Sequence, residues 1–110
     1  MKNFVHTGNV VPLTAPYAVN SGEGLLVGSI FGVAAIDVAV SEEVETAVTG
    51  VYDLAKTTPE AWAQGAKVYW DDTAREATTV ATGNTLIGVA TEAVISAAVT
   101  GRVRLNGSFA

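Results

Sequence analysis

The sequence predicts an all-β protein with a compact β-sandwich or barrel-like fold. Val, Thr and Ala dominate the 110 residues, whereas the strong helix formers Leu, Lys, Arg, Gln and Met are scarce. β-Branched side chains pack well on a pleated surface and are restricted in a helix. Short apolar runs also alternate with clusters of Gly, Asn, Asp and Ser, a pattern typical of sandwiches and barrels. The length suits one domain, residues 1–110.

Nine strands are expected from these apolar runs. The segment EEVETAV alternates charged and apolar side chains with period two, and so does RVRL near the C-terminus. The run FGVAAIDVAV, residues 31–40, is apolar on both sides, which predicts a central strand covered on both faces or a strand in an interface. The expected strands span residues 10–14, 24–27, 30–35, 43–48, 51–54, 67–70, 77–80, 85–91 and 101–105.

One short helical turn is expected near residues 58–64. Thr58 is a suitable N-cap, Pro59 fits the first helical position, and Gly65 can end the turn. The segment TEAVISAAV, residues 91–99, is compatible with a helix by propensity, but a strand followed by a loop is favoured. Residues 1–9 are expected to form an extended N-terminal arm.

Composition narrows the classes of function. Apolar residues make up 49% of the chain and charged residues only 15%, which predicts either an association surface or a core of small side chains. The net charge of −5 repels phosphate backbones, and the few cations are dispersed, so no nucleic-acid partner is expected. The apolar runs are too short and too interrupted for a membrane helix, and the first residues lack a signal-peptide pattern. We therefore expect a soluble protein, made and assembled inside a cell, that has no membrane partner.

The stretch YWDDTAREATTVATGNTLIG, residues 69–88, has the appearance of an active-site loop. Gly83 and Gly88 have the outer spacing of a phosphate-binding loop, but Val89 and Ala90 occupy the positions where that motif requires Lys and Ser or Thr. Without them no side chain reaches the phosphates or binds Mg²⁺. The pattern therefore predicts a turn at Gly83-Asn84 that leads into a strand.

The other candidate chemical groups are incomplete as well. Asp71 and Asp72 would point to opposite faces of a strand, so they are interpreted as an acidic turn in preference to a metal site. His6, the only histidine, lies in a polar N-terminal segment, and two same-face glutamates on EVE are typical of a solvated face. The absence of cysteine excludes disulfides and thiolate sites. No catalytic, cofactor-binding or metal-binding residues are expected.

Contacts with other chains are expected from apolar side chains. Phe4 and Phe109 lie near the termini, where aromatic side chains are hard to bury within their own domain, although packing on the same chain is an equal alternative. Phe31, Val33 and Ile36 belong to the apolar run 31–40, which is a candidate oligomer face because obligate interfaces resemble a domain core.

Several segments, in order, resemble one known family. They are MKNFVHTGNVVPLTAPYAVNSGEGLLVGSIFGVA, TGVYDLAK, WAQGAKVYWDD, ATGNTLIGVA and GRVRLNGSF, and together they span nearly the whole chain. The chain thus resembles the DUF2190 family, the capsid cement or decoration proteins of tailed phages and prophages. Members have sometimes been labelled RecA/RadA-like recombinases, but this sequence has no Walker lysine and no basic DNA surface.

The resemblance implies a non-enzymatic, β-rich virion protein on the outside of the capsid, made in the cytoplasm of the bacterial host. Its partners would be the major capsid protein and copies of itself, with a homotrimer favoured over a dimer. No catalytic residues or cofactors are implied. A virion module that binds a host glycan or receptor is the alternative hypothesis, followed by a recombination-related accessory protein and then an uncharacterised enzyme.

Overall fold

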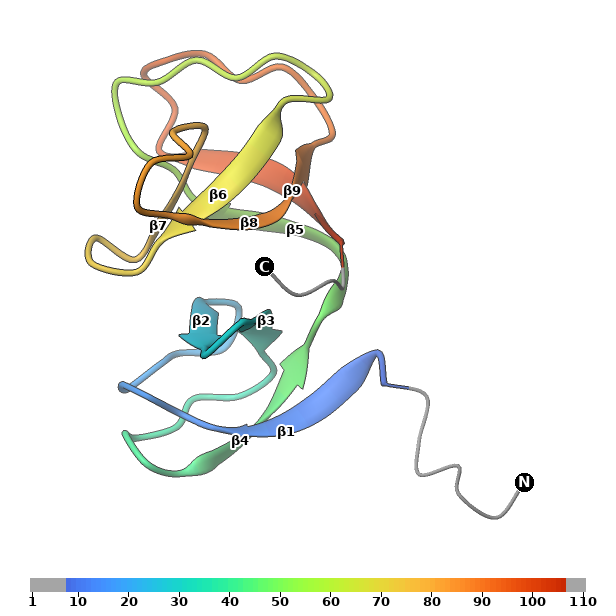
Figure 1. Ribbon diagram of the computed structural model, residues 1–110, viewed down its shortest axis with the longest axis vertical. Coiled ribbons are helices and arrows are strands. Elements are labelled where there is room, and N and C mark those ends of the chain that lie inside the picture. Colours follow the sequence, from blue (N-terminus) through green and yellow to red (C-terminus); the bar gives the residue numbers. More distant parts are fainter. Residues whose placement is uncertain (1–7, 107–110) are drawn as a thin grey trace.

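The computed structural model describes residues 8–106, which form nine strands and no helix (Figure 1). Every expected strand is present, with ends that differ by at most two residues, and the all-β prediction is confirmed. No described segment is a helix long and apolar enough to cross a membrane. The strands are β1 (Val10–Thr14), β2 (Gly24–Val27), β3 (Ile30–Ala34), β4 (Glu43–Ala47), β5 (Thr49–Ala55), β6 (Lys67–Asp71), β7 (Glu76–Thr78), β8 (Thr85–Ala90) and β9 (Thr100–Asn106).

The strands form two antiparallel sheets, one above the other in Figure 1. The four-stranded sheet has the order β1-β4-β3-β2, and the five-stranded sheet has the order β5-β9-β8-β6-β7. The five-stranded sheet curls into a half-barrel. Its two edges approach each other where Lys56, directly after β5, forms a parallel bridge with Ala77 of β7. Only Val48 separates β4 from β5, so the chain passes from one sheet to the other with almost no connection.

Strand β3 joins the two sheets through the side chains on its two faces. Phe31 and Val33 pack into the core of the half-barrel, while Ala34 belongs to a smaller core within the four-stranded sheet. The ring of Phe31 lies 4.9 Å from that of Trp70, tilted by 50°. A Cβ atom on Gly24 would come within 2.7 Å of the Phe31 ring, so this close packing requires glycine there. The expected central, doubly covered strand is thus confirmed for residues 31–34, whereas residues 35–40 of the same apolar run form a mostly exposed connection to β4.

The main core fills the half-barrel and is closed on its open side by β3. Two tryptophans provide its largest apolar surfaces, and branched aliphatic side chains from β5, β6, β8 and β9 complete it. Its buried members are Phe31, Val33, Leu54, Trp62, Val68, Trp70, Ala77, Ile87, Ala90, Val103 and Leu105.

The helical turn expected near residues 58–64 is wrong. Trp62 instead forms an antiparallel bridge with Val94, in which each backbone N–H donates to the other residue's carbonyl at 2.9 Å. The N–H of Glu60 similarly donates to the carbonyl of Ser96 at 3.3 Å. Because these backbone groups pair with a distant segment, they are not free to form a local helical turn. Segment 91–99 is correspondingly a loop with a single bridge, and most of the expected N-terminal arm lies outside the described residues.

Replacing Phe31 with Ala tests whether β3 closes the half-barrel core. We expect Phe31→Ala to lower the free energy of unfolding by about 3–5 kcal/mol, because it opens a cavity beside Trp70. Urea denaturation followed by tryptophan fluorescence measures the change. The control is Val80→Ala, which truncates an exposed apolar side chain just after β7 and should alter stability by less than about 0.5 kcal/mol. Equal losses in both variants would contradict the shared core.

Candidate interaction surface

The two adjacent aspartates at the end of β6 serve the fold separately. The Oδ1 atom of Asp71 accepts backbone N–H bonds from Thr73 at 3.0 Å and Ala74 at 3.2 Å, which confirms the predicted acidic turn. The Oδ1 atom of Asp72 accepts from the indole of Trp70 at 3.1 Å and from the hydroxyl of Tyr17 at 3.2 Å. Within residues 8–106, no group of three or more His, Cys, Asp or Glu side chains is placed to hold a metal ion.

The two spaced glycines have unrelated structural tasks. Gly83 adopts a positive φ of 74° in the turn between β7 and β8, which confirms the turn predicted there. Gly88 lies inside β8, where a Cβ atom would overlap the backbone carbonyl of Arg104. A strand, β8, follows the turn where a phosphate-binding loop would need a helix, so this segment is a sheet framework.

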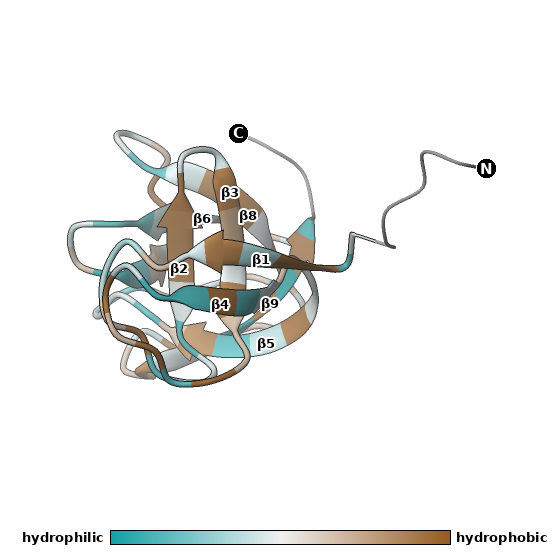
Figure 2. Ribbon diagram, turned by 90° about the horizontal axis from the view of Figure 1, so that it is seen from below, coloured by the Kyte–Doolittle hydropathy of each residue, from teal (hydrophilic) through white to brown (hydrophobic). Residues whose placement is uncertain are grey.

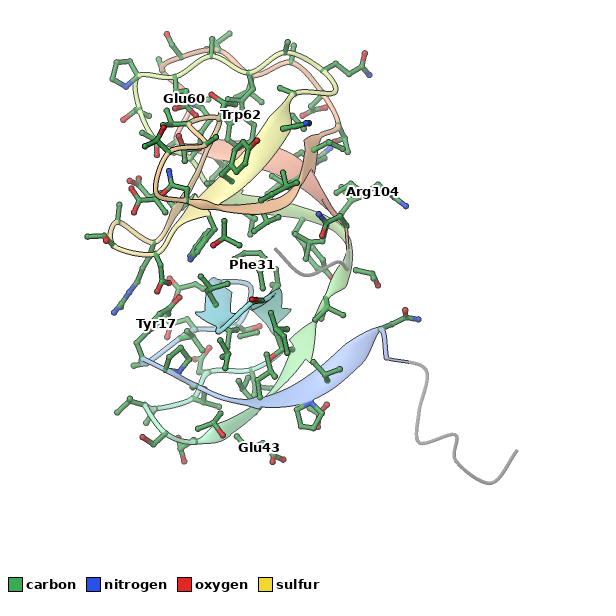
Figure 3. All side chains as sticks on the ribbon, in the orientation of Figure 1. Tyr17, Phe31, Glu43, Glu60, Trp62 and Arg104 are labelled. Atoms are coloured by element: carbon green, nitrogen blue, oxygen red, sulfur yellow. The ribbon has the colours of Figure 1, made fainter. Side chains whose placement is uncertain are left out.

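Tyr17, Asp72 and Arg75 connect the four-stranded sheet to the half-barrel. The guanidinium of Arg75 lies 3.7 Å from the centre of the Tyr17 ring, which is a cation–π geometry. Burial of the Tyr17 hydroxyl and the neighbouring charge of Asp72 raise its pKa to about 12. The hydroxyl therefore stays protonated near neutral pH and can keep donating to Asp72. Tyr17 is visible between the two sheets in Figure 3.

Lys56 is the most unusual residue of the interior. Its side chain is almost completely buried, with 1% of the residue exposed, directly after the end of β5. The Nζ atom donates to the carbonyls of Thr57 at 2.9 Å, of Glu60, and of Ser96 at 3.4 Å. We call residues 56–66 and 91–99 the apical loops. The ammonium group of Lys56 ties these two loops together.

The carboxylate of Glu60 forms hydrogen bonds with three groups at the same end of the molecule. It accepts hydrogen bonds from the indole of Trp62 at 2.8 Å, from the hydroxyl of Thr78 at 2.8 Å and from the backbone N–H of Thr79 at 2.7 Å. Burial raises the pKa of Glu60, but these hydrogen bonds outweigh that effect and hold its pKa below the ordinary value of 4.5. Figure 3 shows Glu60 and Trp62 close together beneath the apical loops.

The outer side of the apical loops carries exposed apolar side chains. Ile95 and Val99 are 73% and 71% exposed, the highest values among the large apolar residues that the structure describes. Ala97 between them is exposed, and residues 93–99 contain no charged side chain. We call Ile95, Ala97 and Val99 the apical surface. Because these exposed apolar side chains lie close together in the sequence, we treat the apical surface as a candidate contact site.

The structure divides the sequence-predicted contact residues into three groups. Phe31 and Val33 are buried in the core of their own subunit, so their side chains are not available on its surface. Ile36 is 56% exposed in the connection between β3 and β4. Phe4 and Phe109, like His6, lie outside the described residues.

Sequence reasoning missed Lys56, Ile95 and Val99. A lysine is usually exposed, and apolar residues are usually interpreted as core, so residue type alone misleads at these positions. The available signal was the uncharged run AVISAAV, which the structure places in a loop and not in a long strand or helix.

Replacing Lys56 with Met tests its role in the apical loops. We expect Lys56→Met to lower the free energy of unfolding by about 2–3 kcal/mol, because buried carbonyls lose a charged donor. Hydrogen exchange of residues 91–99 should accelerate in the same variant. Thr73→Met is the control, because the side chain of Thr73 is exposed in the turn between β6 and β7 and its replacement should leave both measurements nearly unchanged. Unchanged hydrogen exchange of residues 91–99 in Lys56→Met would contradict the proposal that Lys56 links the two apical loops.

Glu60 predicts a specific loss of stability in acid. Its pKa is lowered in the folded protein, so its carboxylate contributes stability above the unfolded-state pKa, and this contribution is lost as pH falls through the folded pKa. The thermal stability of the wild type, measured as its melting temperature, should therefore fall as the pH falls below about 4.5. Glu60→Gln should be less stable at pH 7 and should show a shallower acid dependence. An identical acid dependence would show that another carboxylate dominates.

Comparison with known proteins identifies a family for this chain. Comparison with curated proteins gives no match. A family model described as "Phage cement protein" matches residues 5–105, which include both apical loops and every strand except the last residue of β9. The chain therefore belongs to the phage cement protein family, and its role is structural and associated with the phage capsid.

Proposed function

We propose that the protein binds the outside of the phage capsid as a small oligomer, with a trimer favoured over a dimer, and stabilises junctions between major capsid subunits. The observation that carries this proposal is the family match over residues 5–105, because it covers all but the last residue of the described fold and not one motif. The protein would be made in the cytoplasm of the bacterial host and end on the capsid exterior.

The apical surface supports this proposal as the capsid contact. Ile95 and Val99 project from a loop that is fixed by the bridge between Trp62 and Val94 and by the ammonium of Lys56. A loop that is already ordered loses little conformational freedom on binding, so more of the contact energy appears as affinity. Ile36, exposed in the connection between β3 and β4, is a candidate for a contact with another chain.

The chemistry of the interior supports a structural role. Lys56 and Glu60 are the ionisable groups that a buried active site would use, but their hydrogen-bonding atoms bind backbone carbonyls, an indole, a hydroxyl and a backbone N–H. Several identical subunits in one oligomer would each contribute a modest contact with the capsid. Effective concentration then converts these modest contacts into tight binding.

Co-sedimentation with undecorated phage heads tests the proposal. The wild-type protein should pellet with heads and saturate, whereas Ile95→Asp/Val99→Asp should bind at least about tenfold more weakly, because desolvating a carboxylate in an apolar contact is costly. Val80→Asp is the control, since Val80 is an exposed apolar residue outside the apical loops, and it should bind as the wild type does.

Three results would contradict the proposal or one part of it. If the wild-type protein does not pellet with heads at saturating concentration, the capsid-binding role is wrong. If the purified protein binds host cells and leaves head stability unchanged, the alternative of a receptor-binding or glycan-binding virion module is favoured. If the Val80→Asp control loses binding as strongly as the apical variant, the apical surface is not the contact.

A further inference from the structure

Charge is divided unevenly between the two sheets. From Gly8 to Ala47, which includes the whole four-stranded sheet, the chain has no lysine or arginine. The same segment contains five acidic side chains, Glu23, Asp37, Glu42, Glu43 and Glu45. Every described cation lies in the half-barrel or its loops, at Lys56, Lys67, Arg75, Arg102 and Arg104. The molecule therefore presents one strongly acidic end and one end of mixed charge.

Two of the described cations lack an anionic partner and lie side by side on the half-barrel. Lys67 of β6 pairs in register with Val89 of β8, and Val89 pairs with Arg104 of β9, so both cations flank one exposed valine. Adjacent strands are about 4.8 Å apart, which places the two backbone positions about 10 Å from each other. Neither cation forms an ion pair with another described residue.

These residues line a shallow groove of about 150 Å³, to which Leu86 also contributes. We call Lys67, Leu86, Val89 and Arg104 the cationic groove. Figure 3 shows Arg104 pointing away from the half-barrel. The groove therefore offers two cations around an apolar floor, which fits a segment that combines acidic and apolar side chains.

The connection between β3 and β4 has that composition. Ile36 and Val40 in this connection are each more than half exposed, and the connection together with the start of β4 carries four carboxylates, at Asp37, Glu42, Glu43 and Glu45. We call residues 35–45 the acidic hairpin. β4 is mostly hydrophilic in Figure 2, which views this end of the molecule. Glu43 points outward at the end of the molecule opposite the apical loops in Figure 3.

We propose that the cationic groove of one copy binds the acidic hairpin of a second copy. Within one chain the two surfaces belong to different sheets, and in Figure 3 Glu43 and Arg104 point away from each other. A net charge of −5 makes most contacts between copies repulsive, whereas this contact brings carboxylates to unpaired cations. The exposed side chains of Ile36, Val40 and Val89 add apolar burial.

The contact joins two different surfaces, so it is head-to-tail. Such a contact closes into a ring if the rotation between copies is a whole fraction of a turn. The inference rests on the small oligomer of the proposed function and names the surfaces that form it. Neither of the two surfaces includes a residue of the apical surface.

Charge reversal tests this pairing by light scattering coupled to size-exclusion chromatography. Lys67→Glu/Arg104→Glu and Glu43→Lys/Glu45→Lys should each weaken self-association at least about tenfold. The variant with all four changes keeps the net charge of −5 and should regain the wild-type mass, because the two surfaces have exchanged their signs. Raising the ionic strength to about 1 M should weaken the wild-type assembly. Glu92→Lys is the control for a charge change outside both surfaces.

Lys67→Gln/Arg104→Gln provides a milder variant if a charge-reversed one does not fold, and it should also weaken self-association. Any of three results would overturn the inference. The wild-type protein could be monomeric at about 100 μM, the variant with all four changes could stay monomeric while folded, or the glutamine variant could keep the wild-type mass.

Co-sedimentation of the same variants separates the two proposals. A wild-type monomer that pellets with heads refutes only the self-association, whereas an assembly that depends on these charges but does not pellet refutes only the capsid binding.

Discussion

The apical end of the molecule depends on the buried ammonium group of Lys56. Transferring a charge out of water is costly unless hydrogen bonds compensate for it. Here the backbone of Lys56 joins the two edges of the curled sheet through Ala77, and its Nζ atom binds carbonyls from both apical loops. One residue thus fixes both the closure of the half-barrel and the loops above it. The position of Ile95 and Val99 follows from this arrangement.

A second constraint is that β3 must contribute buried side chains to both hydrophobic cores. Its side chains contribute Phe31 and Val33 to the half-barrel and Ala34 to the smaller sheet, so neither sheet buries its apolar surface without the other. The hydrogen bond from Tyr17 to Asp72 and the contact of Arg75 with the Tyr17 ring add polar contacts between the same two sheets. The acidic hairpin and the cationic groove are therefore held at fixed places relative to each other. A head-to-tail contact between copies requires such fixed geometry.

The strands were predictable from sequence because their signals are local. Period-two alternation in EEVETAV and RVRL, together with turn residues such as Asp71 and Gly83, depends only on neighbouring residues. The helical turn at Thr58 and Pro59 failed because hydrogen bonds from residues more than thirty positions away replaced the local ones. Long-range pairing of this kind leaves no local signature.

The candidate surfaces were less predictable for a related reason. An apolar run such as 31–40 does not reveal whether each side chain faces its own core or a partner, and the structure assigns Phe31 to the core and Ile36 to the surface. The pairing of Lys67, Val89 and Arg104 across three strands depends on sheet order and register. Neither can be obtained from one sequence without the fold.

The nearly direct passage from β4 to β5 has a mechanical consequence. Val48 is the only residue between the two strands, and β5 pairs with β9 over seven residues in antiparallel register. Backbone hydrogen bonds in such a pair lie perpendicular to the strands. A force that pulls the two sheets apart along β5 therefore loads these bonds in shear, where many share the strain, and does not open them one at a time. Tension between the two ends of the molecule is thus carried by a hydrogen-bonded strand and not by a flexible linker.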